Sequence, residues 1–166
     1  MSDHPAAGSY CPSSAPDEPD ATVFGVISGA PEKPTVVYLS DPVLVTRDLL
    51  EKLGDVPASE ALRIAAPCRQ GACAHFRDSQ CSLITKIVRA TPEASADASV
   101  PQCHLRDRCR WWAQEKVAAC RRCPAIVTDD VYADELQWWI ADASTSAEDF
   151  DPRDFVAATA AKSHGD

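Results

Sequence analysis

Residues 109–124 read CRWWAQEKVAACRRCP, a stretch that holds three cysteines, two adjacent tryptophans and four basic residues. The whole chain of 166 residues contains eight cysteines and carries a net charge of −9. Thiols and positive charge therefore gather in one part of an acidic protein. What these thiols bind is the question on which both fold and function depend. The cysteines are Cys11, Cys68, Cys73, Cys81, Cys103, Cys109, Cys120 and Cys123.

The N-terminal sequence MSDHPAAGSYCPSSAPDEPD lacks the basic and apolar regions of a secretory signal. No apolar run approaches the roughly 20 residues that span a bilayer. We therefore expect a soluble, cytoplasmic protein that has no contact with a membrane. Reducing cytosol disfavours disulfides, and eight unligated thiols would be open to oxidation. Metal or cluster ligation is the remaining explanation for so many cysteines.

Composition divides the chain into three parts. Residues 1–20 are small, polar and acidic, and we expect them to be disordered. Residues 21–143 are expected to form a single cysteine-rich metal-binding domain, and residues 144–166 an acidic, loosely ordered tail. Cys11 lies in the first part, far from the other seven cysteines, and we expect it to be an unligated thiol.

The pattern of apolar residues predicts an α-rich α+β fold. Segments 21–29 and 34–40 are rich in β-branched and aromatic residues and predict a small N-terminal β-hairpin. Short helices are expected to follow, around cysteine-bearing metal or cluster loops. The first lies between Thr46 as N-cap and Gly54 at its C-terminal end, and a second covers 59–65. Two amphipathic helices follow, SLITKIVRA, with Leu83, Ile84, Ile87 and Val88 on one face, and 129–143, with Val131, Leu136, Trp139 and Ile140 on its buried side.

The cysteine region separates into two halves around the polar linker 91–101. The first half has the spacing Cys68-x4-Cys73-x-His75-x5-Cys81. The second has the spacing Cys103-x5-Cys109-x10-Cys120-x2-Cys123, followed by Pro124. Each half offers four ligands of the kind that zinc and iron–sulfur clusters prefer. A single four-thiolate site could also take ligands from both halves.

The spacing favours a cluster over zinc. Structural zinc sites usually combine two short Cys-x2–4-Cys units, and this chain has one, Cys120-x2-Cys123. Iron–sulfur motifs tolerate wider spacing and often close with a Cys-Pro pair. We therefore expect a 4Fe–4S cluster held by Cys103, Cys109, Cys120 and Cys123, and a second site built from Cys68, Cys73, Cys81 and His75. Zinc bound to the same residues is the alternative.

Helix geometry limits how the second half can converge. An unbroken helix from Cys109 to Cys120 would separate their Cα atoms by roughly 16 Å. That distance is too long for two ligands of one metal site. Either the helix ends and the chain turns back before Cys120, or the two cysteines serve different sites. The sequence leaves both options open.

Positive charge around the second half suits an anionic site. Residues 106–122 contain six basic and two acidic side chains, a local charge of +4. Four thiolates on zinc or on an oxidised cubane carry a net charge of −2, which arginines would offset, while Trp111 and Trp112 would shield the site from water. A nucleic-acid surface is disfavoured by the isoelectric point of 4.8. Docking of an acidic protein partner stays open.

Several short stretches together resemble a known group of proteins. The run from Cys11-Pro-Ser through VFGVISGAPEKPTVVYL to AAPC, HF, CRWW and ACRRCP is similar to small bacterial cysteine-rich proteins loosely labelled "nitrogen fixation protein". The resemblance spans about residues 11–130 and implies an iron–sulfur or other metal protein, without a reaction. Cys68-Arg-Gln-Gly-Ala-Cys73 also resembles plant-type 2Fe–2S ferredoxins, but Phe76 stands where that family has its next cysteine.

The motifs of common enzyme classes are missing from the sequence. There is no phosphate-binding glycine loop, no Gly-x-Ser-x-Gly and no HExxH. We expect a cytoplasmic iron–sulfur protein that acts in electron transfer or redox sensing for a protein partner, rather than an enzyme. The alternative is a zinc-stabilised interaction module that recruits a protein, with nucleic acid less favoured.

Overall fold

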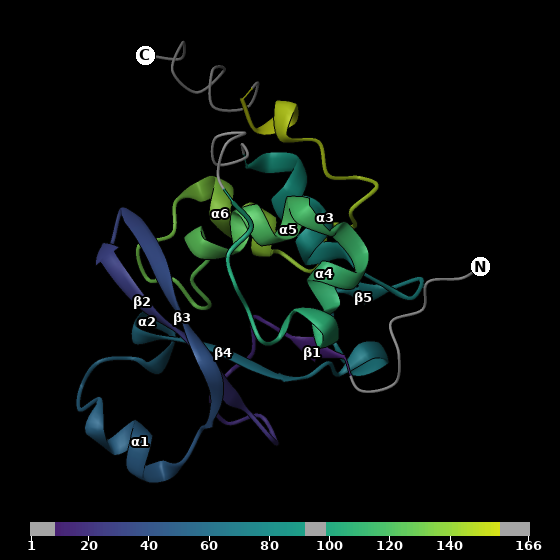
Figure 1. The fold of residues 1–166 in the computed structure, drawn as a ribbon. Coiled ribbons are helices and arrows are strands. Elements are labelled where there is room, and N and C mark those ends of the chain that lie inside the picture. Colours follow the sequence, from purple (N-terminus) through teal and green to yellow (C-terminus); the bar gives the residue numbers. More distant parts are fainter. Residues whose placement is uncertain (1–8, 92–98, 157–166) are drawn as a thin grey trace, which may run out of the picture.

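The centre of the computed structural model, which describes residues 9–91 and 99–156, is a four-stranded sheet (Figure 1). All its pairings are antiparallel, and the strand order is β1-β4-β2-β3. Strands β4 and β2 are therefore interior, and β1 and β3 form the edges. The strands are β1 (Tyr10–Cys11), β2 (Thr22–Ala30), β3 (Lys33–Leu44) and β4 (Leu62–Pro67).

The expected α-rich fold with a small N-terminal hairpin is wrong. About 37% of the structure is helical and 24% is strand, so neither type dominates. The two predicted segments do pair as β2 and β3, but β1 precedes them and β4 covers the other edge of β2. The hairpin is therefore part of a larger sheet and does not stand at the N-terminus.

Strand β4 is the element that the sequence pattern misassigned. The helix expected over 59–65 is limited to α2 (Ala58–Ala61), and the chain then enters β4. Residues 62–66 are all buried. A strand buried on both faces has a continuous apolar pattern, which periodicity cannot distinguish from a buried helix.

The two faces of β4 contribute to different cores. Leu62, Ile64 and Ala66 pack with Val23 on the face covered by α1 (Arg47–Lys52) and α2. Ala65 packs on the opposite face with Phe24, Leu105 and Cys123. The expected ends of α1 are confirmed: Thr46 accepts a hydrogen bond from the Leu49 N–H, and Gly54 follows the helix with φ of 60°.

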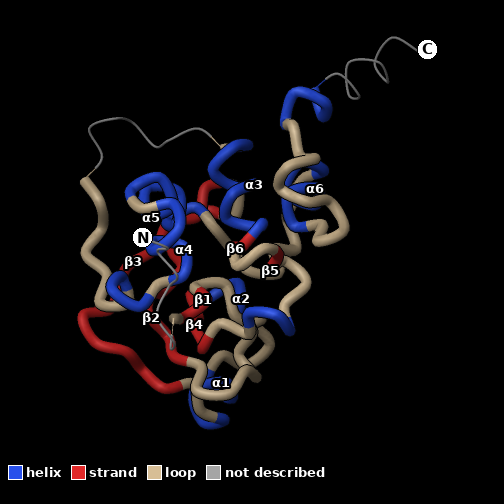
Figure 2. Tube along the Cα trace, turned by 90° about the vertical axis from the view of Figure 1, so that its right-hand side faces the viewer, coloured by secondary structure: helices blue, strands red, loops and turns tan. Residues whose placement is uncertain are grey.

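Four helices form a layer against the second face of the sheet (Figure 1). They are α3 (Ser82–Ala90), α4 (Arg110–Glu115), α5 (Val117–Arg122) and α6 (Glu135–Ala141). Helices α3, α4 and α5 lie together above the strands, and α1 lies at the opposite end of the molecule (Figure 2). Helices α3, α4, α5 and α6 share one apolar core. It contains Ile84, Ile87, Trp111, Ala119 and Ile140 from these helices, and Phe150 from the segment after α6. Within the described ranges, none of the helices has the length and apolar character needed to span a membrane.

Helix α6 is shorter than the amphipathic helix expected over 129–143. It begins at Glu135, because Asp134 caps its N-terminus and Gln137 completes a capping box. Ile140 is buried as expected, whereas Val131 precedes the helix and is 65% exposed. Leu136 and Trp139 pack partly against the helical core.

Shorter elements connect the sheet to the helices. These elements are the single-turn helices η1 (Gln70–Ala72), η2 (Arg106–Arg108) and η3 (Cys123–Ala125), and the hairpin of β5 (Phe76–Arg77) and β6 (Gln80–Cys81). Two cysteines, Cys81 and Cys123, lie in them, and Cys73 and Cys109 directly follow η1 and η2.

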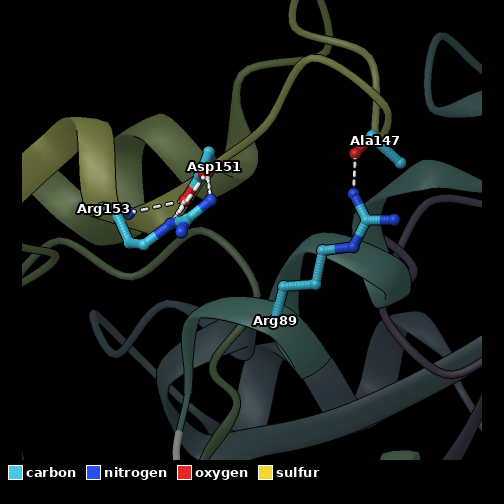
Figure 3. A network of polar contacts seen from close by, with 4 residues as sticks. All are labelled: Arg89, Ala147, Asp151 and Arg153. Carbon is cyan, nitrogen blue, oxygen red and sulfur yellow. Dashed lines mark hydrogen bonds and ion pairs between the residues drawn. The ribbon is translucent and has the colours of Figure 1, made fainter.

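Both ends of the described chain pack against the domain. Ser9 is buried and β1 pairs with β4, although residues 9–20 were expected to belong to a disordered segment. At the other end, Phe150 is buried in the helical core. The Arg89 side chain donates to the Ala147 carbonyl, and Asp151 pairs with Arg153 (Figure 3). The expected disorder of 1–8 and looseness of 157–166 lie outside the described residues.

Gly25 tests how tightly β2 fits between its neighbours. A Cβ atom at Gly25 would lie 2.4 Å from Val36 Cγ1, at a register shift in β2. We expect Gly25→Ala to lower the free energy of unfolding by about 1–3 kcal/mol, because overpacking forces neighbouring atoms apart. Chemical denaturation measures this. Gly71→Ala is the matched control, because a Cβ there meets nothing within 4 Å; equal effects of both changes would contradict the packing argument.

Candidate functional site: a cavity lined by four cysteines

All four cysteines of the second half line one cavity between the sheet and the helical layer. The space between the lining side chains, including its opening to solvent, is about 370 Å³. Aromatic side chains from both layers complete the wall, Phe24 and Tyr38 from the sheet and Trp111 and Trp112 from α4. We call this space the four-cysteine cavity, after Cys103, Cys109, Cys120 and Cys123.

A break at Lys116 brings Cys109 and Cys120 to the same cavity. Helix α4 begins directly after Cys109 and ends at Glu115, and α5 begins at Val117 and contains Cys120. Lys116 between them has φ of 52° and ψ of −129°, so the helical path is interrupted there. The sequence left two options open, and the structure shows the first of them: the helix ends and the chain turns before Cys120.

The tryptophans shield the cavity as the sequence indicated. Trp111 is 1% exposed and belongs to the helical core, while Trp112 is partly buried. The Arg106 guanidinium lies over the Trp112 ring, 5.2 Å from its centroid, and also lines the cavity. Apolar rings and one cation therefore cover part of the cavity, in which Cys123 is buried and the other three cysteines are partly exposed.

Three hydrogen-bond donors in the cavity wall have no acceptor. Within the described part of the chain, the buried Tyr38 hydroxyl, Trp111 Nε1 and Arg106 Nε have no hydrogen-bond partner. Buried polar groups without a partner are uncommon, and each costs stability. Tyr38 interacts with the Cys123 thiol and Arg106 with the Cys120 thiol, so two of these residues would meet the ligands of an anionic guest.

Burial disfavours the thiolate form at three of the four cavity cysteines. Burial raises the pKa of Cys109 to about 12, and burial also raises the pKa of Cys103 and Cys120. Backbone N–H groups of Trp112 and Trp111 oppose the rise at Cys109, and Arg106 opposes it at Cys120. A cationic metal centre that binds thiolates would therefore displace protons, and its affinity would fall with decreasing pH.

Arg63 places a positive charge beside the cavity. Its side chain is 0% exposed and donates to the carbonyls of Cys123, Ile126 (2.8 Å) and Pro12 (3.0 Å). Its guanidinium carbon lies 5.2 Å from the centroid of the Phe24 ring. No acidic side chain accepts from it in the residues that the structure describes.

The buried charged side chains among the described residues are all positive. The buried charged residues of the described ranges are Arg63, Lys86 and Arg110, and no carboxylate is among them. Burying an uncompensated charge is costly, so such groups are normally paired. The cysteines would supply the missing negative charge as thiolates once a metal centre displaced their protons. Sequence reasoning pointed to the basic residues of 106–122 and missed Arg63, whose only signal was a charge inside the apolar run LRIAA.

The cysteines of the first half gather elsewhere, together with Cys11. Cys81 has Cys73 and Cys68 as neighbouring thiols, and Cys11 has Cys81 and Cys68. His75, expected as the fourth ligand, instead has Lys86, Asp142 and Arg77 as its charged neighbours. The two halves of the sequence therefore form separate groups, and they do not combine in one site. All eight cysteines are free thiols.

The thiols do not form a compact group of the kind that holds a single metal ion. Among residues 9–91 and 99–156, no three histidine, cysteine or carboxylate side chains are grouped so that they could hold a metal ion.

Comparison with protein-family models, curated proteins and solved structures finds no match for this chain. The resemblance to the bacterial cysteine-rich group therefore stays a prediction, and the function has to be argued from the site itself.

Lys116 provides a test of the break between α4 and α5. A left-handed backbone costs a residue with a side chain about 1–2 kcal/mol, and glycine avoids this cost. We expect Lys116→Gly to raise the free energy of unfolding by roughly 1 kcal/mol. Lys52→Gly, inside α1, is the control and should lower it by up to about 1 kcal/mol. A loss of stability in Lys116→Gly would show that the turn is not strained.

Proposed function

We propose that this protein is an iron–sulfur protein whose four-cysteine cavity holds a 4Fe–4S cluster and which transfers electrons, or senses redox state, for a protein partner in the cytoplasm. The observation that carries the proposal is the convergence of Cys103, Cys109, Cys120 and Cys123 on one cavity. The unpartnered donors in its wall support it further.

The arrangement of the ligands favours a cluster over a single ion. Four thiolates on one zinc ion lie within about 4.6 Å of one another, because each Zn–S bond is near 2.3 Å. A cluster of several irons spreads its ligands over a larger body. The four thiols line one cavity, and their wide spacing in the sequence, closed by the Cys123-Pro124 pair, is typical of cluster ligands. We therefore propose the larger guest.

The surrounding residues would stabilise a bound anion. Arg63 supplies a buried positive charge, and the Tyr38 hydroxyl and Trp111 Nε1 are buried donors without another partner. Positive charge and hydrogen bonds to sulfur raise the reduction potential of a cluster, since the reduced form carries more negative charge. Trp111 and Trp112 would exclude water from the ligands.

The proposed role requires two protein reactants. A bound cluster supplies a one-electron couple: it accepts one electron from a reduced donor protein and gives one to an oxidised acceptor protein. Arg108 and Lys116 are exposed on segments next to the cavity. We therefore expect the partner to present an acidic surface, which these side chains would attract.

Anaerobic, iron-replete expression tests the proposal. We expect a brown protein that absorbs near 400 nm and contains iron and sulfide. The double variant Cys109→Ala/Cys120→Ala should lose about four irons per chain, because two of four ligands are gone. Ser40→Ala, at an exposed position of β3, serves as the control and should lose none. Colourless protein with stoichiometric zinc would instead support a zinc-stabilised interaction module.

Tyr38 tests how the cavity wall acts on its guest. Burial raises the pKa of Tyr38, and its interaction with the Cys123 thiol adds to the rise, which places the hydroxyl beside that sulfur. Tyr38→Phe keeps the ring and removes the donor, so the reduction potential of the cavity cluster should become more negative, by tens of millivolts as an order of magnitude. Potentiometric titration measures it.

The matched control for this change is Tyr132→Phe. Tyr132 is 63% exposed, so removal of its hydroxyl should leave the potential unchanged. A potential that is the same in Tyr38→Phe and in the unmodified protein would show that the hydroxyl does not donate to a cluster ligand.

A further inference from the structure

We infer that Cys11, Cys68, Cys73 and Cys81 form a second four-thiolate cluster site, and that this site adjoins the four-cysteine cavity. The inference rests on the proposed function, because it assigns a second cluster to the same protein. It replaces His75 with Cys11 as the fourth ligand. We call these four residues the N-terminal thiol group.

Strand pairing brings Cys11 to Cys68. Cys11 lies opposite Ala66 in the antiparallel pair of β1 and β4, and Tyr10 lies opposite Pro67. The register continues one step further, because the Cys68 N–H donates to the Ser9 carbonyl at 2.8 Å. Cys11 and Cys68 are therefore diagonal neighbours on adjacent strands, a relation that places residues roughly 7–8 Å apart. That spacing suits two ligands of one cluster.

The β5–β6 hairpin brings Cys73 to Cys81. Phe76 pairs with Cys81 across the hairpin, and the Phe76 N–H donates to the Cys73 carbonyl at 3.0 Å. The turn between the strands uses Asp78 and Ser79, both with positive φ, as in a type I′ hairpin turn. Cys81 is buried and stands directly before α3. Both cysteines are thereby fixed by backbone geometry.

The two pairs meet in one group. Burial raises the pKa of Cys11 to about 11, and the Cys81 and Cys68 thiols add to that rise. Burial likewise raises the pKa of Cys81, with contributions from Cys73 and Cys68. Backbone geometry also connects the pairs, because the single turn η1 lies between Cys68 and Cys73 and the Cys73 N–H donates to the Gln70 carbonyl at 2.7 Å. The four thiols therefore come from one continuous arrangement of strand, turn and hairpin, although among the described residues they are not grouped so that they could hold a single ion.

His75 is a weaker candidate than Cys11 for the fourth ligand. Its carbonyl accepts from the Ser82 N–H at 2.7 Å, which orients the hairpin. The charged neighbours of its imidazole are Lys86, Arg77 and Asp142, and Lys86 is also a neighbour of Cys81. Its buried Nδ1 has no hydrogen-bond partner within the described residues. Strand pairing places Cys11 beside Cys68, whereas the charged groups nearest the imidazole are not thiols.

Donors surround this group as they surround the cavity. The Ser13 N–H and the Ser14 hydroxyl lower the pKa of Cys11, and N–H groups of Ile84 and Leu83 lower that of Cys81, against the larger effect of burial. Arg110, 2% exposed, stacks over the Phe76 ring at 5.1 Å, and its Nε has no partner within the described residues. The same chemistry therefore repeats: buried thiols, donors to sulfur and a buried cation.

Strand β1 separates the two sites by the thickness of one strand. Cys11 belongs to the N-terminal thiol group, and the next residue, Pro12, lines the four-cysteine cavity. Tyr10 forms a bridge with Cys109, a cavity residue. On the other side, Gln114 of α4 accepts from the Cys81 N–H at 2.8 Å and donates to the Cys81 carbonyl at 3.1 Å. Residues of the two sites are therefore neighbours along the chain and across the Tyr10–Cys109 bridge, and we expect two clusters here to interact magnetically.

Iron and sulfide analysis of anaerobically reconstituted full-length protein tests the inference. We expect about eight irons per chain in the unmodified protein, and about four in Cys11→Ala, since each cubane contains four. His75→Ala should keep about eight. Cys11→Ser and Cys68→Ser are the second variants, in case alanine prevents folding, and each should lose the same four irons.

Paramagnetic resonance of the fully reduced protein gives a second readout. The unmodified protein should show a spectrum broadened by interaction between two clusters. Both Cys11→Ser and Cys109→Ala/Cys120→Ala should show the simple spectrum of one isolated cluster.

The outcomes separate the two proposals. About four irons in the unmodified protein, lost only in Cys109→Ala/Cys120→Ala, would overturn the second site and leave the proposed function standing. Retention of about eight irons in Cys11→Ser, with a loss in His75→Ala, would overturn the ligand set. Eight irons without magnetic interaction would overturn the adjacency. Protein without iron or sulfide would overturn the proposed function and the inference together.

Discussion

The buried guanidinium of Arg63 holds the two layers of this protein together. It extends from the interior strand β4 and donates to carbonyls of three other segments, at Pro12, Cys123 and Ile126. Through these bonds the sheet is joined to the residues after β1 and to η3 at the end of the helical layer. Carbonyl oxygens accept from its two terminal nitrogens, but its buried Nε has no partner within the described residues and the charge is not cancelled. The structure therefore has a cation in its interior that a nearby negative charge would stabilise. The cysteines are the groups that would supply this charge.

The distribution of charge explains how an acidic protein can have a basic interior. The net charge is −9, yet the buried charged residues of the described chain are all cations. Of the arginines expected to balance the thiols, Arg106 lines the cavity, whereas Arg108 and Arg110 stack on the rings of Tyr10 and Phe76. Local charge in the sequence therefore indicated the correct region but not the residues that carry the interaction.

Features that depend on local sequence could be predicted, and those that depend on distant contacts could not. The pattern of SLITKIVRA predicted α3, and Thr46 and Gly54 marked the ends of α1. By contrast, LRIAA becomes a strand because β1 and β2 flank it, and Cys11 joins other thiols because β1 pairs with β4. The break at Lys116 also had no local signal, since lysine is not a residue that favours positive φ. Cysteine spacing predicted the membership of the four-cysteine cavity but not the fourth member of the N-terminal thiol group.

Strand β1 is only two residues long, and it contributes to both thiol sites. So short a pairing contributes little stability, and its attachment to the fold would draw on whatever the thiols bind. Binding of the proposed clusters would therefore be coupled to the docking of residues 9–12 against the sheet.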